Sequence, residues 1–388
     1  MQGTLVDAMH PESAEIALPQ FDAVGLARRA ALPAAVVIAG VATLILVQGK
    51  LGLIADAFHR ALDADWRWVA AGAAFELLSF AGYVALMWLV AGRATPRIDL
   101  RRAVEVTLGG AAATRLLPTA GVGGAALTLW TFRRAGMNKR ASMRTLLTFL
   151  VVLYAVFLGA IVVSGAVTAA GGEGPLTLSA IPAAIAATLF AVVLVLGLWR
   201  RRVGANGITD AGREPAALEQ VGSPVTDTTK PRAGRVRRGA LILGDATADA
   251  IGLLRTRDPR LLGALAWWTF DAAVLWAMLS AFGAANAIAV VALAYFVGQV
   301  GNALPIPGAV SGGMIGVLLA FGVQADLAVV GVLAYRAIAI WLPAPIGLLA
   351  LASLRRTIAR WSHEQAGETV VDGQRADRRP LGRPRVAA

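Results

Sequence analysis

The sequence has no cysteine and only three histidines, which fall in separate polar stretches. Without cysteine there is no disulfide, no thiolate metal site and no catalytic thiol, and histidines so dispersed form no ligand cluster. The sequence also lacks a P-loop, an acidic metal-binding cluster and a Ser/His/Asp arrangement. We therefore expect neither enzymatic activity nor a resident cofactor or metal ion.

Charged residues are also scarce. They make up only 15% of the 388 residues, whereas soluble domains carry about a quarter. In contrast, 57% of the residues are hydrophobic and the mean hydropathy is +0.66. About six apolar runs are long enough to cross a bilayer core of roughly 30 Å, at residues 30–48, 68–90, 145–168, 179–199, 261–282 and 325–354. The composition predicts an all-α fold, a polytopic membrane helix bundle.

The net charge of +12 follows the pattern of a membrane protein, and no nucleic-acid partner is expected. Basic residues gather beside the apolar runs and in the polar tails, and such clusters mark cytoplasmic loops. We predict a multi-pass protein of the bacterial cytoplasmic (inner) membrane, with an amino-terminal segment at 1–29 and a basic, disordered tail at 355–388 both in the cytoplasm. Because residues 1–29 are long and acidic, the first apolar run is expected to be an uncleaved anchor.

A polar stretch at 200–260 divides the chain into two membrane halves, 30–199 and 261–354. It is rich in proline, threonine, glycine and charge, which is typical of a disordered linker. Its last part, 239–254, alternates apolar and acidic groups at helical spacing. Two interpretations remain open for this part: an amphipathic helix at the membrane interface, or a short solvated helix.

Each half contains one apolar segment broken by proline and glycine. "LLPTAGVGG" lies within residues 103–132 (the first hook), and "ALPIPGAVSGG" lies within 287–322 (the second hook). The leg before the first break reaches only about 22 Å, and both flanks of this hook are basic, which predicts a re-entrant segment entering from the cytoplasm. The second hook has no basic flank and is predicted to enter from outside, although a full crossing followed by a half-helix is the alternative.

The paired breaks predict an inverted repeat. Corresponding Gly/Pro-interrupted segments in two halves point to a transporter's binding site near the membrane midplane. The alternative is that both breaks reflect only how common glycine and proline are in membrane helices. In each hook a double glycine opens the second half-helix, whose start exposes unpaired N–H groups and suits a phosphate or a carboxylate.

Few polar side chains lie deep in the apolar segments, and such residues usually face a partner or a cavity. They are Glu76, Arg115, Asp271 and Arg336, with Gln299 and Asn302 near the second break. Arg115 and Arg336 are expected to hold a phosphate together with the two helix starts and Asn302. The alternative is that the arginines form structural ion pairs with Glu76 and Asp271.

The hooks "RLLPTAGVGGAALTLWTFRRAGM" and "GNALPIPGAVSGGMIGVLLAFGV", followed by "YRAIAIWLP", resemble the lysylphosphatidylglycerol synthase transmembrane-region family over most of residues 30–355. The resemblance implies functional positions at Pro118, Gly123, Gly124, Pro305, Gly308, Gly312, Gly313 and Arg336. In bifunctional members this region is implicated in moving an aminoacylated phospholipid between leaflets, while a separate soluble domain makes it. No soluble domain accompanies the hooks here, so lysyl transfer is not implied. Relatives often carry an acid in each hook that this chain lacks.

These observations predict a flippase or transporter for an anionic phospholipid or a lipid-linked precursor. Its partners would be membrane lipids with anionic headgroups. The alternative is a non-transporting, lipid-binding scaffold that recruits an envelope glycosyltransferase or a lipid-modifying enzyme through the linker and the tail. A membrane-embedded transferase is the weakest hypothesis, because the sequence contains no acid/base or metal cluster.

Overall fold

The structure, a computed structural model, describes residues 64–116, 122–172, 174–207, 232–284, 287–303 and 308–377. These residues form helices joined by short turns and contain no strand, which confirms the predicted all-α bundle. Five of the helical stretches are long and apolar enough to cross a membrane: Trp66–Ala94, Lys139–Ala170, Leu176–Val203, Pro259–Ala281 and Ala325–Ser362. They match five of the six predicted spans. The remaining span, 30–48, lies outside the described residues.

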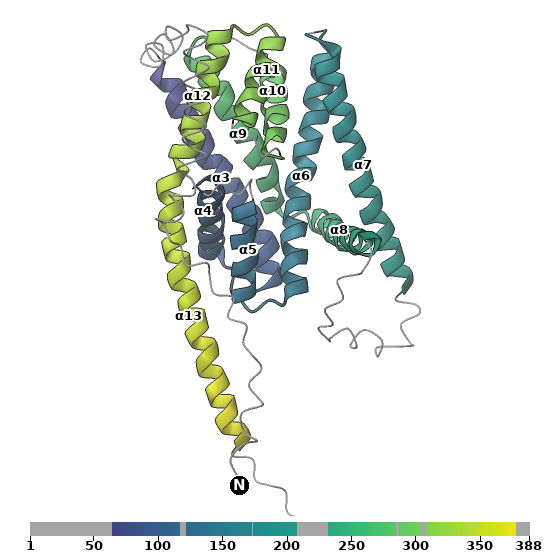
Figure 1. Ribbon diagram of the computed structural model, residues 1–388, viewed down its shortest axis with the longest axis vertical. Coiled ribbons are helices and arrows are strands. Elements are labelled where there is room, and N and C mark those ends of the chain that lie inside the picture. Colours follow the sequence, from purple (N-terminus) through teal and green to yellow (C-terminus); the bar gives the residue numbers. More distant parts are fainter. Residues whose placement is uncertain are drawn as a thin grey trace, which may run out of the picture. The chain divides into compact units, whose positions relative to one another are not determined.

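Helices α3 (Trp66–Ala94) and α9 (Leu262–Ala281) form a closely packed pair within the bundle (Figure 1). Glycines at their crossing explain the close approach. A Cβ added at Gly263 would lie 2.2 Å from the carbonyl oxygen of Gly82, so neither position tolerates a side chain. The Ser79 hydroxyl also donates a 2.9 Å hydrogen bond to the carbonyl of Trp267. Small residues and interhelical hydrogen bonds are the usual means by which membrane helices associate.

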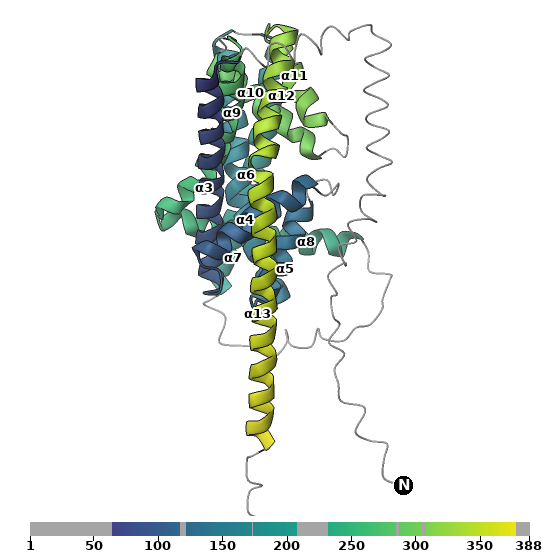
Figure 2. The ribbon, with the colours of Figure 1, turned by 90° about the vertical axis from the view of Figure 1, so that its left-hand side faces the viewer.

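Each predicted hook is a hairpin of two short helices. The first consists of α4 (Leu100–Leu116, 17 residues) and α5 (Val122–Arg134, 13 residues). The second consists of α10 (Ile288–Val300, 13 residues) and α11 (Ala309–Ala320, 12 residues). At 1.5 Å per residue such helices are about 18–26 Å long, shorter than a bilayer core. The two hairpins lie toward opposite ends of the bundle (Figures 1 and 2).

The remaining long helices enclose one side of the bundle. Helix α6 (Lys139–Ala170) packs against α10, while α7 (Leu176–Gly207) contacts α6 and α8 and exposes most of its apolar side chains. Helix α8 (Arg232–Arg255) lies across α6 and α7 (Figure 1). The sequence prediction of a helix at 239–254 is therefore confirmed. Its acidic residues pair with arginines of the long helices, Asp249 with Arg144 and Asp245 with Arg200.

The last predicted span breaks near its middle, as its prolines indicate. Helix α12 (Ala325–Trp341) ends just before Pro343, where α13 (Pro343–Asp377) begins. The prediction of a disordered tail from Arg355 onward is wrong as far as Asp377, because α13 continues to that residue. Packing explains the difference, since Ile358 and Trp361 are buried. The prolines on which the prediction of a disordered tail rested all follow Asp377.

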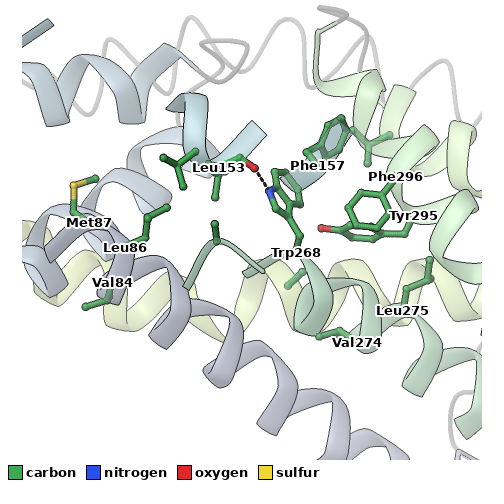
Figure 3. Packing of buried hydrophobic residues seen from close by; sticks show 14 of the residues in the cluster. Val84, Leu86, Met87, Leu153, Phe157, Trp268, Val274, Leu275, Tyr295 and Phe296 are labelled. Carbon is green, nitrogen blue, oxygen red and sulfur yellow. Dashed lines mark hydrogen bonds between the residues drawn. The ribbon is translucent and has the colours of Figure 1, made fainter. Parts of the chain in front are cut away.

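The core is rich in aromatic side chains from α6, α9 and α10 (Figure 3). The Trp268 ring lies 4.8 Å from the ring of Phe157, centroid to centroid. The Trp268 indole N–H donates a 2.8 Å hydrogen bond to the carbonyl of Leu153, which fixes the ring at the α6–α9 contact. Tyr295 packs edge-on against Phe296 in the same cluster. This rigid core positions Trp268 and Tyr295 beside the cavity described next.

Candidate functional site

A cavity of about 580 Å³ lies between the two hairpins. The α4–α5 hairpin contributes mainly small residues, among them Gly110, Thr114, Gly124 and Thr128. The α10–α11 hairpin contributes Gln299, Asn302, Gly308, Ala309, Val310 and Ser311. The volume falls in the usual range for small-molecule sites. Two segments from opposite halves of the sequence, which sequence analysis singled out as hooks, therefore meet at one site.

Arg336 lines this cavity from α12 and is half-buried. The ion pairs between described residues lie elsewhere, and none includes Arg336. A cation at this depth is costly to insert unless it faces a partner or a wet cavity. The alternative interpretation, a structural ion pair, is therefore not seen for Arg336 among the described residues. Its guanidinium lines the cavity, where it can face an anion.

The amino-terminal end of α11 also faces the cavity. Gly308 precedes the helix with a φ of 81°, a left-handed conformation that favours glycine. No described side chain caps this helix start, and the next three residues, Ala309 to Ser311, line the cavity. The first N–H groups of a helix have no intrahelical acceptor and carry partial positive charge. The start of α11 that lines the cavity is therefore set by Gly308, whereas the double glycine expected to open this helix, Gly312–Gly313, lies one turn inside it.

The first hook is built differently. The amide N–H of Gly124 donates to the Thr114 hydroxyl, so a side chain of α4 already satisfies part of the start of α5. Gly124 packs directly against α4, and Gly313 packs against α10, where a Cβ would lie 3.0 Å from the Cα of Gly298. Gly312 is exposed with open space around it, and Gly123 is half-buried. The two double glycines are therefore not equivalent.

A buried acidic group lies at the wall of the cavity. Asp271 of α9 accepts hydrogen bonds from the hydroxyls of Tyr295 (α10) and Tyr335 (α12), the latter at 3.3 Å. The Gln299 amide donates to the Tyr335 oxygen at 3.2 Å, and the Asn302 amide donates to Gln299 at 2.6 Å. A continuous chain of hydrogen bonds thus connects exposed Asn302 with buried Asp271.

Asp271 and Asn302 are recognisable candidates in the sequence, but Tyr335, which lies between them, and Tyr295, which also binds Asp271, were missed. The chain contains only four tyrosines. Tyr83, Tyr154 and Tyr335 line the cavity, and Tyr295 binds Asp271. A tyrosine inside an apolar helix needs a hydrogen-bond partner for its hydroxyl, so the scarcity of tyrosine was the signal that could have located the site.

The structure separates Glu76 from the other candidates. Glu76 is buried in α3 and lines a second cavity of about 460 Å³ with apolar neighbours such as Phe80 and Ile346. Arg115 occupies the last turn of α4, next to the cavity residue Thr114, while its side chain lies outside the described part of the chain. Pro118 and Pro305 also lie outside the described residues.

Comparison with known families bears directly on this site. The family model for the lysylphosphatidylglycerol synthase transmembrane region matches residues 32–347. That range contains both hairpins, the cavity between them and Arg336, and it ends within α13. No curated protein matches the chain. Because the family model covers most of the chain, this multi-pass membrane protein belongs to the lysylphosphatidylglycerol synthase transmembrane-region family.

Proposed function

We propose that the protein moves an anionic phospholipid or a lipid-linked precursor between the leaflets of the membrane. The family connects the chain with lipid metabolism or transport. The observation that carries the finer proposal is the pairing of Arg336 with the uncapped start of α11 in one cavity. Together they supply a full positive charge and several N–H donors, which suit a phosphate group.

The surroundings of the cavity fit a lipid better than a soluble anion. Most large apolar side chains of α7 are exposed, including Leu189, Val192 and Val195, as expected of a surface that faces acyl chains. The two hairpins are too short to span a bilayer core. We therefore propose that both are re-entrant, that they form an inverted repeat, and that the headgroup binds near the midplane while the acyl chains remain in the bilayer.

The remaining sequence predictions enter the proposal unchanged. The protein would act without catalysis in the bacterial cytoplasmic membrane, with both termini in the cytoplasm, and Arg115 would approach the headgroup from α4. Lipid movement would be downhill or coupled to an ion or the membrane potential, because the sequence contains no ATP-binding motif.

One feature favours the second candidate function, a lipid-binding scaffold. Helix α13 continues well past the other helices and carries basic residues such as Arg356 and Arg360 (Figure 2). An extended basic helix is a suitable docking element for a glycosyltransferase or a lipid-modifying enzyme. A scaffold requires α13 but tolerates changes in the cavity, whereas a flippase requires the cavity.

Proteoliposomes that contain the full chain and a fluorescent lipid separate the two functions. We expect the protein to move fluorescent phosphatidylglycerol from the inner to the outer leaflet, where an external quencher reaches it. It should move phosphatidylcholine far less. Arg336→Gln should slow phosphatidylglycerol movement roughly tenfold or more, because it removes a charge-assisted hydrogen bond. Arg133→Gln is the matched control, since Arg133 is an exposed residue at the end of α5. If the wild-type protein moves no lipid, the flippase proposal is wrong and the lipid-binding scaffold becomes the better-supported function.

A further inference from the structure

The cavity contains a matched pair of opposite charges. Among the described side chains that line it, Asp271 is the acidic one and Arg336 is the basic one. Asp271 is only 5% exposed, yet it faces the space where an anionic headgroup would bind. Ionisable side chains inside membrane segments are rare and often serve as proton relays. The position of Asp271 therefore requires a functional account of its own.

We propose that Asp271 binds one proton whenever the cavity binds one anionic headgroup, so that the protein couples lipid binding to proton uptake. This inference rests on the proposed function and names its coupling ion. With Asp271 ionised, its charge offsets that of Arg336 among the described lining side chains, and an entering phosphate meets a carboxylate. With Asp271 neutral, the charge of Arg336 is uncompensated and attracts the phosphate. Each ligand therefore strengthens the binding of the other.

The hydrogen bonds around Tyr335 allow this change without movement of the helices. In the ionised state the Tyr335 hydroxyl donates to Asp271 and accepts from Gln299. A hydroxyl oxygen has two acceptor positions and a hydrogen that can rotate. When a proton from the aqueous phase forms an O–H bond on Asp271, this group can donate to Tyr335, whose own hydrogen then turns into the cavity. No other covalent bond is made or broken.

The other titratable groups near Asp271 do not compete for this proton. Helices packed against α9 present Tyr83 from α3, Tyr154 from α6, Tyr295 from α10, and Tyr335 and Arg336 from α12. Tyrosine ordinarily titrates near pH 10, and arginine remains charged throughout the working range. Glu76 of α3 opens onto the second cavity, and Arg260, just before α9, binds Asp258. A pH-dependent charge in this cavity therefore belongs to Asp271.

The test measures binding of short-chain phosphatidylglycerol to the purified full-length protein in detergent between pH 5 and pH 8, with phosphatidylcholine as the neutral probe. We expect phosphatidylglycerol affinity to fall as the pH rises, by up to tenfold per pH unit, since a single proton is linked to binding. Phosphatidylcholine binding should not change. In weak buffer, binding of phosphatidylglycerol should also cause the protein to take up protons, at most one for each lipid bound.

Substitutions assign the effect to one carboxylate. Asp271→Asn, an uncharged isostere, should bind phosphatidylglycerol tightly at every pH. Glu105→Gln is the matched control, because Glu105 is also a buried carboxylate with hydroxyl partners, Ser353 and Thr357, but does not line the cavity. It should keep the wild-type profile. Tyr335→Phe should move the midpoint of the pH-dependent change in phosphatidylglycerol affinity to higher pH. The reason is that the ionised Asp271 carboxylate loses a hydrogen-bond donor.

The outcomes separate this inference from the proposed function. Equal phosphatidylglycerol binding by the wild-type protein at all pH values, without proton uptake, would overturn the coupling and leave anionic-lipid binding intact. Failure to bind phosphatidylglycerol at any pH would overturn the proposed function itself. If Asp271→Asn does not fold, Tyr335→Phe decides the assignment, and an unshifted midpoint in that variant would count against Asp271.

Discussion

The amide N–H of Gly124 donates a 3.0 Å hydrogen bond to the hydroxyl of Thr114, across the turn between α4 and α5. The same hydroxyl donates to the carbonyl of Gly110, one turn earlier in α4. A Cβ added at Gly124 would lie 2.3 Å from the Thr114 hydroxyl oxygen and 2.7 Å from the Gly110 carbonyl oxygen. This glycine therefore allows α5 to lie directly against α4.

Replacement of Gly124 by alanine should destabilise the protein despite the better helix propensity of alanine. Overpacking of this kind typically costs about 1–3 kcal/mol, whereas the propensity gain is only about 1 kcal/mol. Gly312→Ala is the control, because Gly312 has open space where its Cβ would be added. Thermal unfolding of the purified variants should show a lower midpoint for Gly124→Ala only. Equal midpoints would mean that the α4–α5 contact is looser than described.

The crossing of α3 and α9 should tolerate an added side chain even less than the α4–α5 contact does. A Cβ at Gly263 would lie 2.2 Å from the carbonyl oxygen of Gly82 and 3.1 Å from the amide nitrogen of Leu86, and backbone atoms cannot rotate away. Gly263→Ala should therefore force the two helices apart and speed amide hydrogen exchange in both. Gly316→Ala, at an open position of α11, should leave exchange unchanged. Protection of α3 and α9 that survives in Gly263→Ala would contradict this packing.

Asp258 gives the protein a defined response to acid. It precedes a short 3₁₀ turn, Pro259–Leu261, and binds Arg260 at 2.7 Å. The hydrogen bond from the Arg260 side chain lowers the pKa of Asp258 from 3.8 to about 2. Because the folded pKa is depressed, the contribution to stability is present above about pH 4 and is lost as the pH falls toward 2.

Asp258→Asn should remove that response. Acid unfolding in detergent, followed by tryptophan fluorescence, should show a smaller loss of stability between pH 4 and pH 2 in the variant than in the wild-type protein. Arg260 also lies over the Trp88 ring, 4.6 Å from its centroid, so the fluorescence reports on this region directly. Parallel acid profiles for the two proteins would show that the pair contributes nothing to folding.

The sequence predicted the spans and the hooks well, because the physical cause of each is local. Membrane-length apolar runs and Leu-Pro breaks are visible along the chain, and the structure places long helices at five of the runs and ends a short helix before each break. Arg336 and Asp271 were also identified, because a charge in an apolar run is conspicuous. The structure brings both into one cavity with Asn302 and Gly308.

The missed features depend on contacts between distant segments. Thr114 is an ordinary threonine in the sequence, and its role as a cap depends on a turn that brings Gly124 beside it. Tyr295 and Tyr335 acquire their role only when three helices meet around Asp271. The extension of α13 depends on burial of residues such as Ile358 and Trp361. None of these contacts leaves a periodic pattern in the sequence.

The break at Pro343 divides the last span between the two walls of the cavity. Helix α12, which carries Arg336, packs on α9 and α11, whereas α13 packs along α4. Gly347 of α13 fits so closely against α4 that a Cβ there would lie 2.7 Å from the carbonyl oxygen of Leu108. Proline has no N–H to continue the helical hydrogen-bond ladder. The joint at Pro343 therefore connects the helix that carries Arg336 to the helix that packs on the α4–α5 hairpin, so its bend sets how far Arg336 lies from that hairpin.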